Sequence, residues 1–169
     1  MADTTASPPS GHSASIRVAP LDPAALDSAA LEGARALFAE SGAPELVAER
    51  FERALGETPE SRAVAAFDGD GAAAGIVLFG LVAGALGTGA VFWLAVRADR
   101  RRHGVGRALL ALAKAELAAE GARIVIAEVP DDAAGMAKML AGGGFAREGV
   151  VPDFYRDGVS LTIWRFALS

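Results

Sequence analysis

Residues 72–96 contain no charged side chain, and this limits what the chain can fold into. Such a run could cross a bilayer as one helix, or it could supply two strands buried inside a sheet. The segment GALGTG, residues 84–89, places three glycines within it, and glycine clusters break helices. Both halves are rich in Val, Leu and other residues typical of buried strands. We therefore predict two adjacent central strands, and we keep a membrane-associated protein as the less favoured alternative.

The remainder of the chain alternates between strand and helix patterns. Asp-Gly pairs at residues 68–71 predict a hairpin turn, and Asp22 followed by Pro23 predicts the start of a helix that ends near Gly42. Apolar periodicity predicts further helices at residues 44–55, 104–121 and 131–144, the last capped by Asp131 or Asp132. Strands are predicted at residues 14–20, 61–67, 73–83, 90–96, 123–129, 145–151 and 159–168. This order, βααβββαβαββ, predicts an α/β fold with a mixed sheet and helices on both faces.

Composition narrows the classes of function. The net charge of -5 argues against nucleic-acid binding, which needs a basic face. The chain has no cysteine, so we expect a reducing compartment, the cytoplasm. Its only histidines are His12 and His103, so we expect no metal site. Residues 1–13 are small and polar and predict a disordered tail, which leaves residues 14–169 as a single domain.

The corner between the strand at 90–96 and the helix at 104–121 is basic, although the protein is acidic. Its sequence, RADRRRHGVGRALL, places arginines and a histidine around Gly104 and Gly106. The first turn of a helix presents unpaired N–H groups and a partial positive charge, so it attracts anions and above all phosphate. Glycines without side chains let a phosphate approach the backbone closely. We therefore predict a phosphate or pyrophosphate site at this helix start.

Two common phosphate motifs do not fit this corner. Arg107 and Ala108 stand where a P-loop needs Lys and Ser or Thr, and Leu109 stands where a dinucleotide fingerprint needs its third glycine. The pattern that remains, R-x-x-G-x-G from Arg101 to Gly106, resembles the loop of the GNAT superfamily of acetyl-CoA-dependent N-acetyltransferases. The apolar strand before it, the long helix after it and the later GGGF at 142–145 resemble the same family. The resemblance covers residues 14–168.

The resemblance implies a fold and a coenzyme site. The sheet would be mostly antiparallel, with six or seven twisted strands, and a bulge would splay the strand at 90–96 from its neighbour. Leu94, Ala95 and Val96 would pair with the pantetheine arm of acetyl-CoA. The pyrophosphate would be held by backbone amides and by the side chain of Arg101 or Arg100. The residues assigned to this loop are Arg101, Arg102, His103, Gly104, Val105, Gly106 and Arg107.

The sequence departs from the family where a general acid is expected. The family often has a tyrosine five residues before the Phe of the Gly-Phe strand, and here that position is Leu140. A familiar asparagine near the start of the same helix is also absent. The one tyrosine of the chain, Tyr155, is our candidate for a substitute acid or an acceptor-binding residue, with a packing role as the alternative. Glu128, at the end of its strand, is the candidate general base, ahead of Asp153, which we read as a turn residue.

The function that follows from the resemblance is transfer of an acetyl group from acetyl-CoA to a primary amine of a small molecule or peptide, by direct attack in a ternary complex. The acceptor would lie near the helical region at 23–55 and the loop at 152–158, and either Phe92 or Trp93 would face it. A non-catalytic acyl-CoA-binding module is the alternative, because Leu140 replaces the tyrosine. Leu161 and Trp164 put apolar residues on both faces of the last strand, which indicates helix cover on one side or a homodimer contact.

Overall fold

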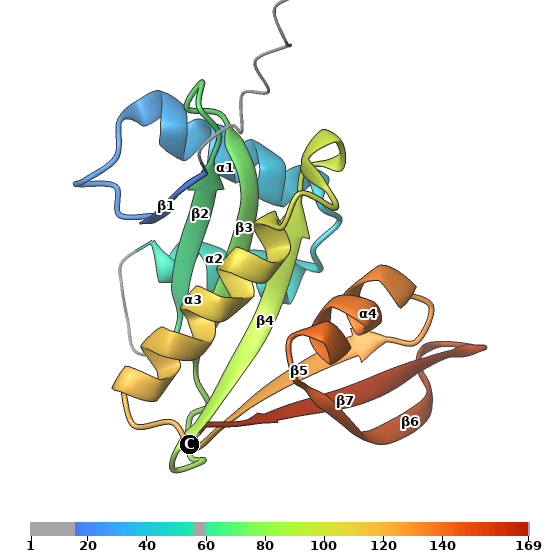
Figure 1. Cartoon of the computed structure of the whole chain (residues 1–169). Coiled ribbons are helices and arrows are strands. Elements are labelled where there is room, and N and C mark those ends of the chain that lie inside the picture. The colour runs from blue at the N-terminus through green and yellow to red at the C-terminus, as the bar shows by residue number, and fades with distance from the viewer. Residues whose placement is uncertain (1–15, 56–59, 169) are drawn as a thin grey trace, which may run out of the picture.

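Seven strands form one sheet in the computed structural model, which describes residues 16–55 and 60–168 (Figure 1). The strands are β1 (Arg17–Pro20), β2 (Arg62–Phe67), β3 (Ala73–Leu81), β4 (Thr88–Val96), β5 (Ile124–Pro130), β6 (Ala146–Arg156) and β7 (Val159–Ala167). The helices are α1 (Ser28–Glu40), α2 (Glu45–Ala54), α3 (Val105–Ala119) and α4 (Ala134–Gly142), with a short 3-10 helix, η1 (Ala98–Arg100), before α3.

The strand order in the sheet is β1-β2-β3-β4-β5-β7-β6. Within the described residues every neighbouring pair is antiparallel except β4 and β5, which run parallel. Parallel neighbours need a crossover connection, and α3 supplies it. The predicted element order and the mostly antiparallel mixed sheet are therefore confirmed.

Two apolar clusters hold the layers together, one on each face of the sheet. Helices α3 and α4 pack on one face, and α1 and α2 pack on the other (Figure 1). Strand β3 belongs to both clusters, because Val77 and Phe79 point to the α3 side while Ile76 and Leu78 point to the α1 side. All four side chains are at most 1% exposed. Burial on both faces explains why this stretch carries no charge.

The uncharged run forms two strands joined by a glycine-containing turn, as predicted. Gly84 and Gly87 in that turn have φ angles of 78° and 72°, which suit glycine and end the strand. None of the helices in the described part of the chain is both long enough and apolar enough to cross a membrane.

The first helix begins later than the sequence predicted. Asp22 accepts a bond from the Ala24 N–H at 2.8 Å, and it starts only a turn. The N-cap of α1 is Asp27, whose side chain accepts from the Ala30 N–H at 2.7 Å. Both aspartates satisfy the chemistry of a cap, so local preference alone did not separate them. The predicted end is confirmed, since Gly42 follows the C-cap with φ 75°.

The C-terminal elements also differ from the prediction. The N-cap of α4 is Ala133 and makes no side-chain cap bond, so the expectation of Asp131 or Asp132 was wrong. Strand β6 runs on to Arg156 through residues that were predicted to be a loop. Its pairing with β7 is irregular between Val151 and Arg156, so the segment is a bulged strand end. Residues 1–13 and the first residues of the predicted 14–20 strand lie outside the described residues.

Candidate active site

A bulge in β4 opens the sheet between β4 and β5. Val91 pairs with Phe79 and Trp93 pairs with Leu78, so Phe92 is an extra residue in the ladder. A bulge bends its strand and increases the twist. The parallel pairing of β4 with β5 ends at Val91, and beyond it the two strands diverge from their common end (Figure 1). The splayed strands predicted for this chain are therefore observed.

A slot of about 190 Å³ lies where the strands separate. The splayed part of β4 forms one wall and the end of β5 forms the other, while Met136 and Met139 of α4 close the α4 side. Among the described residues that line the slot, Glu128 is the one charged residue, and the others are apolar. Such a slot suits an uncharged, extended ligand arm with one carboxylate beside it.

The residues predicted to pair with a pantetheine arm lie on this slot edge. Leu94, Ala95 and Val96 pair with β3 on one side and have no strand partner on the β5 side. Leu94 lines the slot itself. The carbonyl of Val96 accepts a bond from Nε of Arg101 at 3.1 Å, so the arginine side chain folds back along the strand.

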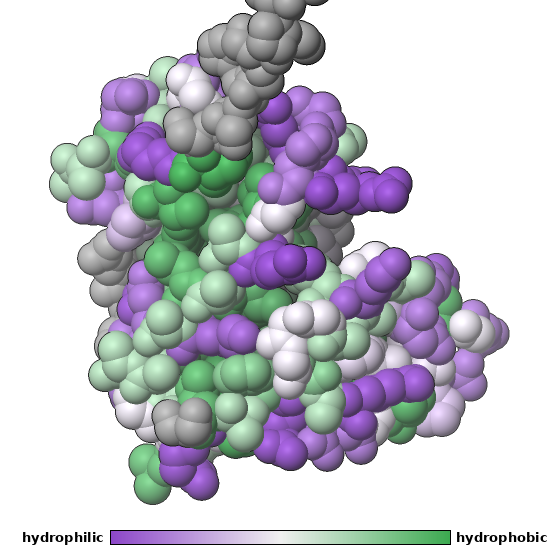
Figure 2. Space-filling model, viewed as in Figure 1, coloured by the Kyte–Doolittle hydropathy of each residue, from purple (hydrophilic) through white to green (hydrophobic). Residues whose placement is uncertain are grey.

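The loop that leads into α3 has two residues in the left-handed region. Arg102 has φ 66° and Gly104, the N-cap of α3, has φ 84°. The side chains of Arg101, Arg102, His103 and Arg107 are exposed, and the loop projects from the body of the protein where Figure 2 shows hydrophilic atoms at the upper right. The first backbone N–H groups of α3 are free of intrahelical partners, because a helix begins here. Backbone donors and cationic side chains thus meet just beyond the end of β4, the strand whose Leu94 lines the slot.

The two glycines of the motif are needed for different reasons. A Cβ on Gly104 would meet nothing within 4 Å, so this position needs glycine for its φ and leaves open space above the helix start. A Cβ on Gly106 would lie 2.8 Å from Sδ of Met139 and 3.4 Å from Val96. Gly106 is therefore a packing residue that lets α3 approach α4 and β4 closely, which the sequence reading did not distinguish.

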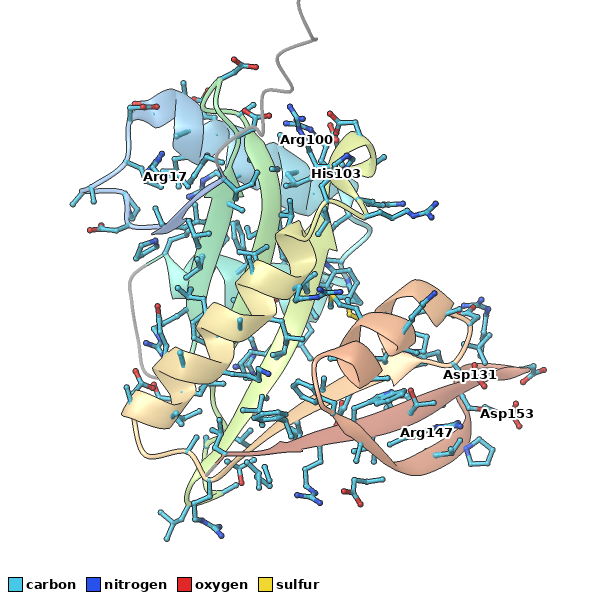
Figure 3. The ribbon with its side chains drawn as sticks, viewed as in Figure 1. Arg17, Arg100, His103, Asp131, Arg147 and Asp153 are labelled. Carbon is cyan, nitrogen blue, oxygen red and sulfur yellow. The ribbon has the colours of Figure 1, made fainter. Side chains whose placement is uncertain are left out.

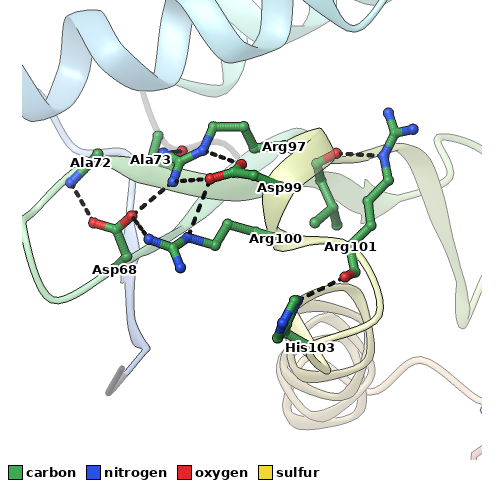
Figure 4. A network of polar contacts seen from close by, with 9 residues as sticks. Asp68, Ala72, Ala73, Arg97, Asp99, Arg100, Arg101 and His103 are labelled. Carbon is green, nitrogen blue, oxygen red and sulfur yellow. Dashed lines mark hydrogen bonds and ion pairs between the residues drawn. The ribbon is translucent and has the colours of Figure 1, made fainter. Parts of the chain in front are cut away.

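Part of the basic cluster holds an internal carboxylate. Nη2 of Arg97 and Nη2 of Arg100 donate to Oδ2 of Asp68 at 2.8 and 2.9 Å, and Arg97 also binds Asp99 at 2.7 Å (Figure 4). The hydrogen bond from Arg97 and then that from Arg100 lower the pKa of Asp68 to about 2, against the cost of burial. The hydrogen bond to Asp99 and then that to Asp68 raise the pKa of Arg97. Arg100, named beside Arg101 as a phosphate ligand, is engaged with Asp68, and Arg101 stays exposed.

His103 takes part through its position in the loop. Its ring Nδ1 lies 2.8 Å from the carbonyl oxygen of Arg101, and the side chain is exposed. Figure 3 shows His103 beside the helix start and Arg100 on the side of the β2–β3 turn, at the same end of the sheet. The ring therefore braces the loop locally.

The two predicted catalytic residues lie near each other. Glu128 is exposed on β5, and it points away from the α3 face that its neighbours Ala127 and Val129 bury. Burial and then the negative charge of Glu128 raise the pKa of the Tyr155 hydroxyl. Tyr155 is 42% exposed and makes an edge-to-face contact with Phe154, with ring centroids 5.1 Å apart. The bulged end of β6 thus brings the single tyrosine of the chain toward the candidate base.

Other positions that the sequence singled out have structural roles. Leu140 is 1% exposed and packs in the core on the α3 side. Asp153 has φ 52°, and its side chain accepts from the Gly158 N–H at 2.8 Å, so it is a turn residue, as the sequence predicted. Asp132 binds Arg156 at 2.7 Å. In the described part of the chain no group of His, Cys, Asp and Glu is placed to hold a metal ion.

Phe92 and Trp93 do not divide between core and acceptor as predicted. The bulge turns both toward the α1–α2 side, where they pack with the cluster of that face, and both also line the slot. Nε1 of Trp93 donates to Oγ of Ser41 at 2.8 Å. The guanidinium of Arg50 lies 3.9 Å from the centroid of the Phe92 ring, and burial lowers the pKa of Arg50. The sequence reading missed Ser41, Arg50 and Asp68, because their partners lie far away in the chain.

Solved structures with the same arrangement are known. A GNAT-family protein from Desulfovibrio desulfuricans is 26% identical, covers 92% of this chain and 100% of its own, and has a TM-score of 0.77. Nourseothricin acetyltransferase is 29% identical over 66% of this chain and 67% of its own, with a TM-score of 0.62. An acetyltransferase from Bacillus subtilis, solved in complex with CoA, is 13% identical over 92% of this chain and 100% of its own, with a TM-score of 0.72, and shares the fold.

The family is shown at the level of sequence as well. No functionally curated protein sequence resembles the chain closely enough to count as a match. The family model of the acetyltransferase (GNAT) family, in contrast, matches residues 26–144, which include β4, the loop with Gly104 and the helix α3. The chain therefore belongs to the acetyltransferase (GNAT) family.

Proposed function

We propose that the protein is an N-acetyltransferase that moves the acetyl group of acetyl-CoA to a primary amine of a small molecule or peptide, by direct attack in a ternary complex. The observation that carries this proposal is the slot between the splayed β4 and β5, together with the cationic loop that follows β4 at the start of α3. The loop suits a pyrophosphate, and the slot is lined by a carboxylate, Glu128. The absence of cysteine supports a cytoplasmic setting.

The coenzyme contacts follow from the surfaces that the slot presents. The pantetheine arm has amides, and the edge of β4 at Leu94, Ala95 and Val96 has no strand partner on the β5 side. Alternate residues face that side, and because the N–H of Arg97 points to β3, the free groups are those of Leu94 and the N–H of Val96, whose carbonyl accepts from Arg101. The pyrophosphate would fit in the open space over Gly104 and bind the exposed cationic side chains of the loop. The loop residues assigned to it are Arg101, Arg102, His103, Gly104, Val105, Gly106 and Arg107. We assign Gly106 a packing role within this set.

The chemical step needs a proton to leave the amine and a thiolate to leave the thioester. An alkylamine with a pKa of ~10.4 is mostly protonated at neutral pH. Glu128 lines the slot, which supports our assignment of this carboxylate as the base that takes the amine proton. The amine nitrogen then forms a bond to the thioester carbon, and the C–S bond breaks with its electron pair on sulfur. Tyr155 donates its hydroxyl proton to that thiolate, and through water it regains the second proton that the nitrogen gives up as the amide forms. Its raised pKa keeps the hydroxyl protonated at neutral pH.

A non-catalytic acyl-CoA-binding module is the second candidate, and burial of Leu140 favours it. The position where the family often has its acid is part of the core, 1% exposed, and offers no proton. Turnover separates the two candidates, because a binding module takes up acetyl-CoA without consuming it.

Calorimetric titration with acetyl-CoA, followed by thiol release measured across a panel of primary amines, tests the proposal. Binding together with amine-dependent release of free CoA supports the transferase. Binding without release on any amine of the panel favours the binding module. Absence of binding would overturn both, since both depend on the coenzyme site at Gly104.

A further inference from the structure

Asp68 is a buried acid whose two carboxylate oxygens do different work. Its side chain is 2% exposed and lies in the turn between β2 and β3. Oδ1 accepts from the N–H groups of Asp70 and Ala72 at 3.2 and 3.0 Å, and these bonds shape the turn itself. Oδ2 accepts from Arg97 and Arg100, which stand 29 and 32 residues further along the chain (Figure 4). The turn needs only the first oxygen, so the second one serves the loop after β4.

We propose that Asp68 is a positioning residue for the coenzyme loop, and that it holds the segment from Arg97 to Gly104 in the shape that presents the first turn of α3. The inference rests on the proposed function, because it assigns this loop to acetyl-CoA. Asp68 touches neither the slot nor the exposed face of the loop. It acts through Arg97, the residue before η1, and Arg100, the last residue of η1.

The loop is fixed to the sheet at its first half. The backbone N–H of Arg97 donates to the carbonyl of Ala74 at 2.9 Å, and its Nη1 donates to the carbonyl of Ala73 at 2.9 Å. Nη2 of Arg100 donates to the carboxylate of Asp68. Beyond Arg100 the bonds of the loop are local, from Arg101 to Val96 and from His103 to Arg101. The exposed second half includes the left-handed Arg102, a conformation that costs free energy for a residue other than glycine. The anchor at Asp68 therefore restrains the segment that must adopt this conformation.

Removal of the Asp68 charge distinguishes a positioning role from a purely electrostatic one, because the two predict opposite changes in coenzyme affinity. A carboxylate near an anion site repels the anion, so its neutralisation by itself strengthens coenzyme binding. Loss of a positioning contact weakens binding instead, because the loop then loses conformational freedom on binding. The Asp68→Asn variant keeps an oxygen for the two turn N–H groups and replaces the other oxygen with an amide that cannot accept from arginine. It therefore removes the contact to the loop and leaves the turn bonds in place.

Asp70 supplies the matched control. It lies in the same turn, is exposed, and carries the same charge, so Asp70→Asn makes an equal change in net charge. Arg100→Gln is the second variant, since it keeps the bond between Arg97 and Asp68 and removes only one of the two loop contacts. Each protein is first melted thermally, and binding is then measured at a temperature where it is folded.

The measurement is the Kd of acetyl-CoA by calorimetry, together with the KM of each substrate. We expect Asp68→Asn to weaken acetyl-CoA binding by about 3- to 30-fold, with an unchanged KM for the amine. We expect Arg100→Gln to weaken it in the same direction and Asp70→Asn to leave it within about twofold. A merely structural role for Asp68 would lower the melting temperature without this split between the two substrates.

The results distinguish this inference from the proposed function. If the wild-type protein does not bind acetyl-CoA, the proposed function fails and this inference falls with it. If the wild type binds and Asp68→Asn binds equally or more tightly, the proposed function stands and the positioning role of Asp68 is wrong. If Asp68→Asn does not fold, Arg100→Gln decides, and unchanged coenzyme binding in that variant overturns the inference.

Discussion

Gly104 allows the anion site to be tested with a control at the other end of the same helix. Gly104 precedes α3 with φ 84°, and Gly121 follows it with φ 83°. A Cβ at either glycine would meet nothing within 4 Å, so alanine strains the backbone at both positions without a clash. The left-handed conformation costs a residue with a Cβ about 1–2 kcal/mol. We therefore expect Gly104→Ala and Gly121→Ala each to lower the melting temperature by about 2–8 °C.

Glutamate at the same two positions separates the charge from the strain. An anion at the start of a helix stabilises it by about 0.3–1 kcal/mol, so Gly104→Glu is expected to melt above Gly104→Ala. A bound pyrophosphate about 5 Å away would be repelled by about 1–3 kcal/mol, which weakens binding about 5- to 150-fold. Stability and coenzyme affinity thus change in opposite directions between these two Gly104 variants.

The assay is calorimetric titration with acetyl-CoA beside thermal melting, for the four variants and the wild type. Gly121→Glu carries the same added charge and the same strain at the far end of α3, so we expect it to bind acetyl-CoA as Gly121→Ala does. Equal affinity in Gly104→Glu and Gly121→Glu would refute the assignment of the pyrophosphate to this loop. Loss of affinity in Gly121→Glu as well would show that the effect is not local to Gly104.

Three further outcomes are expected. Glu128→Gln lowers kcat/KM for the amine by about 10²- to 10⁴-fold with an unchanged Kd for acetyl-CoA. Steady-state kinetics check this beside the control Glu148→Gln, because Glu148 is exposed on β6 and does not line the slot. Tyr155→Phe lowers kcat by about 10²-fold, and an unchanged kcat would leave Tyr155 no chemical role. In the wild type, kcat does not fall through ionisation of Tyr155 below about pH 10, because the pKa of Tyr155 is raised. The pKa of Asp68 is lower in the folded protein than its ordinary value of 3.8, so the Asp68 carboxylate stabilises the folded protein at a pH above 3.8. This contribution disappears as the pH falls toward about 2. Acid melts should show Asp68→Asn lacking that step, and parallel curves would argue against the ion pairs.

Much of the fold could be predicted because local chemistry and the tertiary structure agree. The glycines at 42 and 121 end helices where the sequence placed them, with φ angles of 75° and 83°. The uncharged stretch became β3 and most of β4, since a strand covered by helices on both faces has no place for a charge. Apolar periodicity predicted a helix from residue 104, and α3 begins one residue later, at Val105, with the left-handed Gly104 as its N-cap.

What the sequence could not supply are contacts that depend on the third dimension. The family resemblance predicted a bulge in the strand at 90–96, but its position at Phe92 has no local signal, because VFWL is equally compatible with a regular strand. The consequence of the bulge is that Phe92 and Trp93 share one side. Asp22 and Asp27 are equally suitable N-caps by local sequence, and packing of α1 against the sheet selects Asp27. The role of Gly106 depends on Met139 from another helix.

The basic corner shows how one cluster of charge can serve two purposes. Arg97 and Arg100 are each 30% exposed at the side chain and face Asp68, so their charge is largely balanced inside the protein. Arg101, Arg102 and Arg107 are exposed and form no ion pair within the described residues, so their charge is available to a ligand. A flexible loop with five free arginines would attract anions without a fixed geometry, whereas an anchored loop presents donors at defined positions. Asp68 therefore uses two of the arginines to fix the shape of the loop, and the remaining arginines attract the anionic ligand.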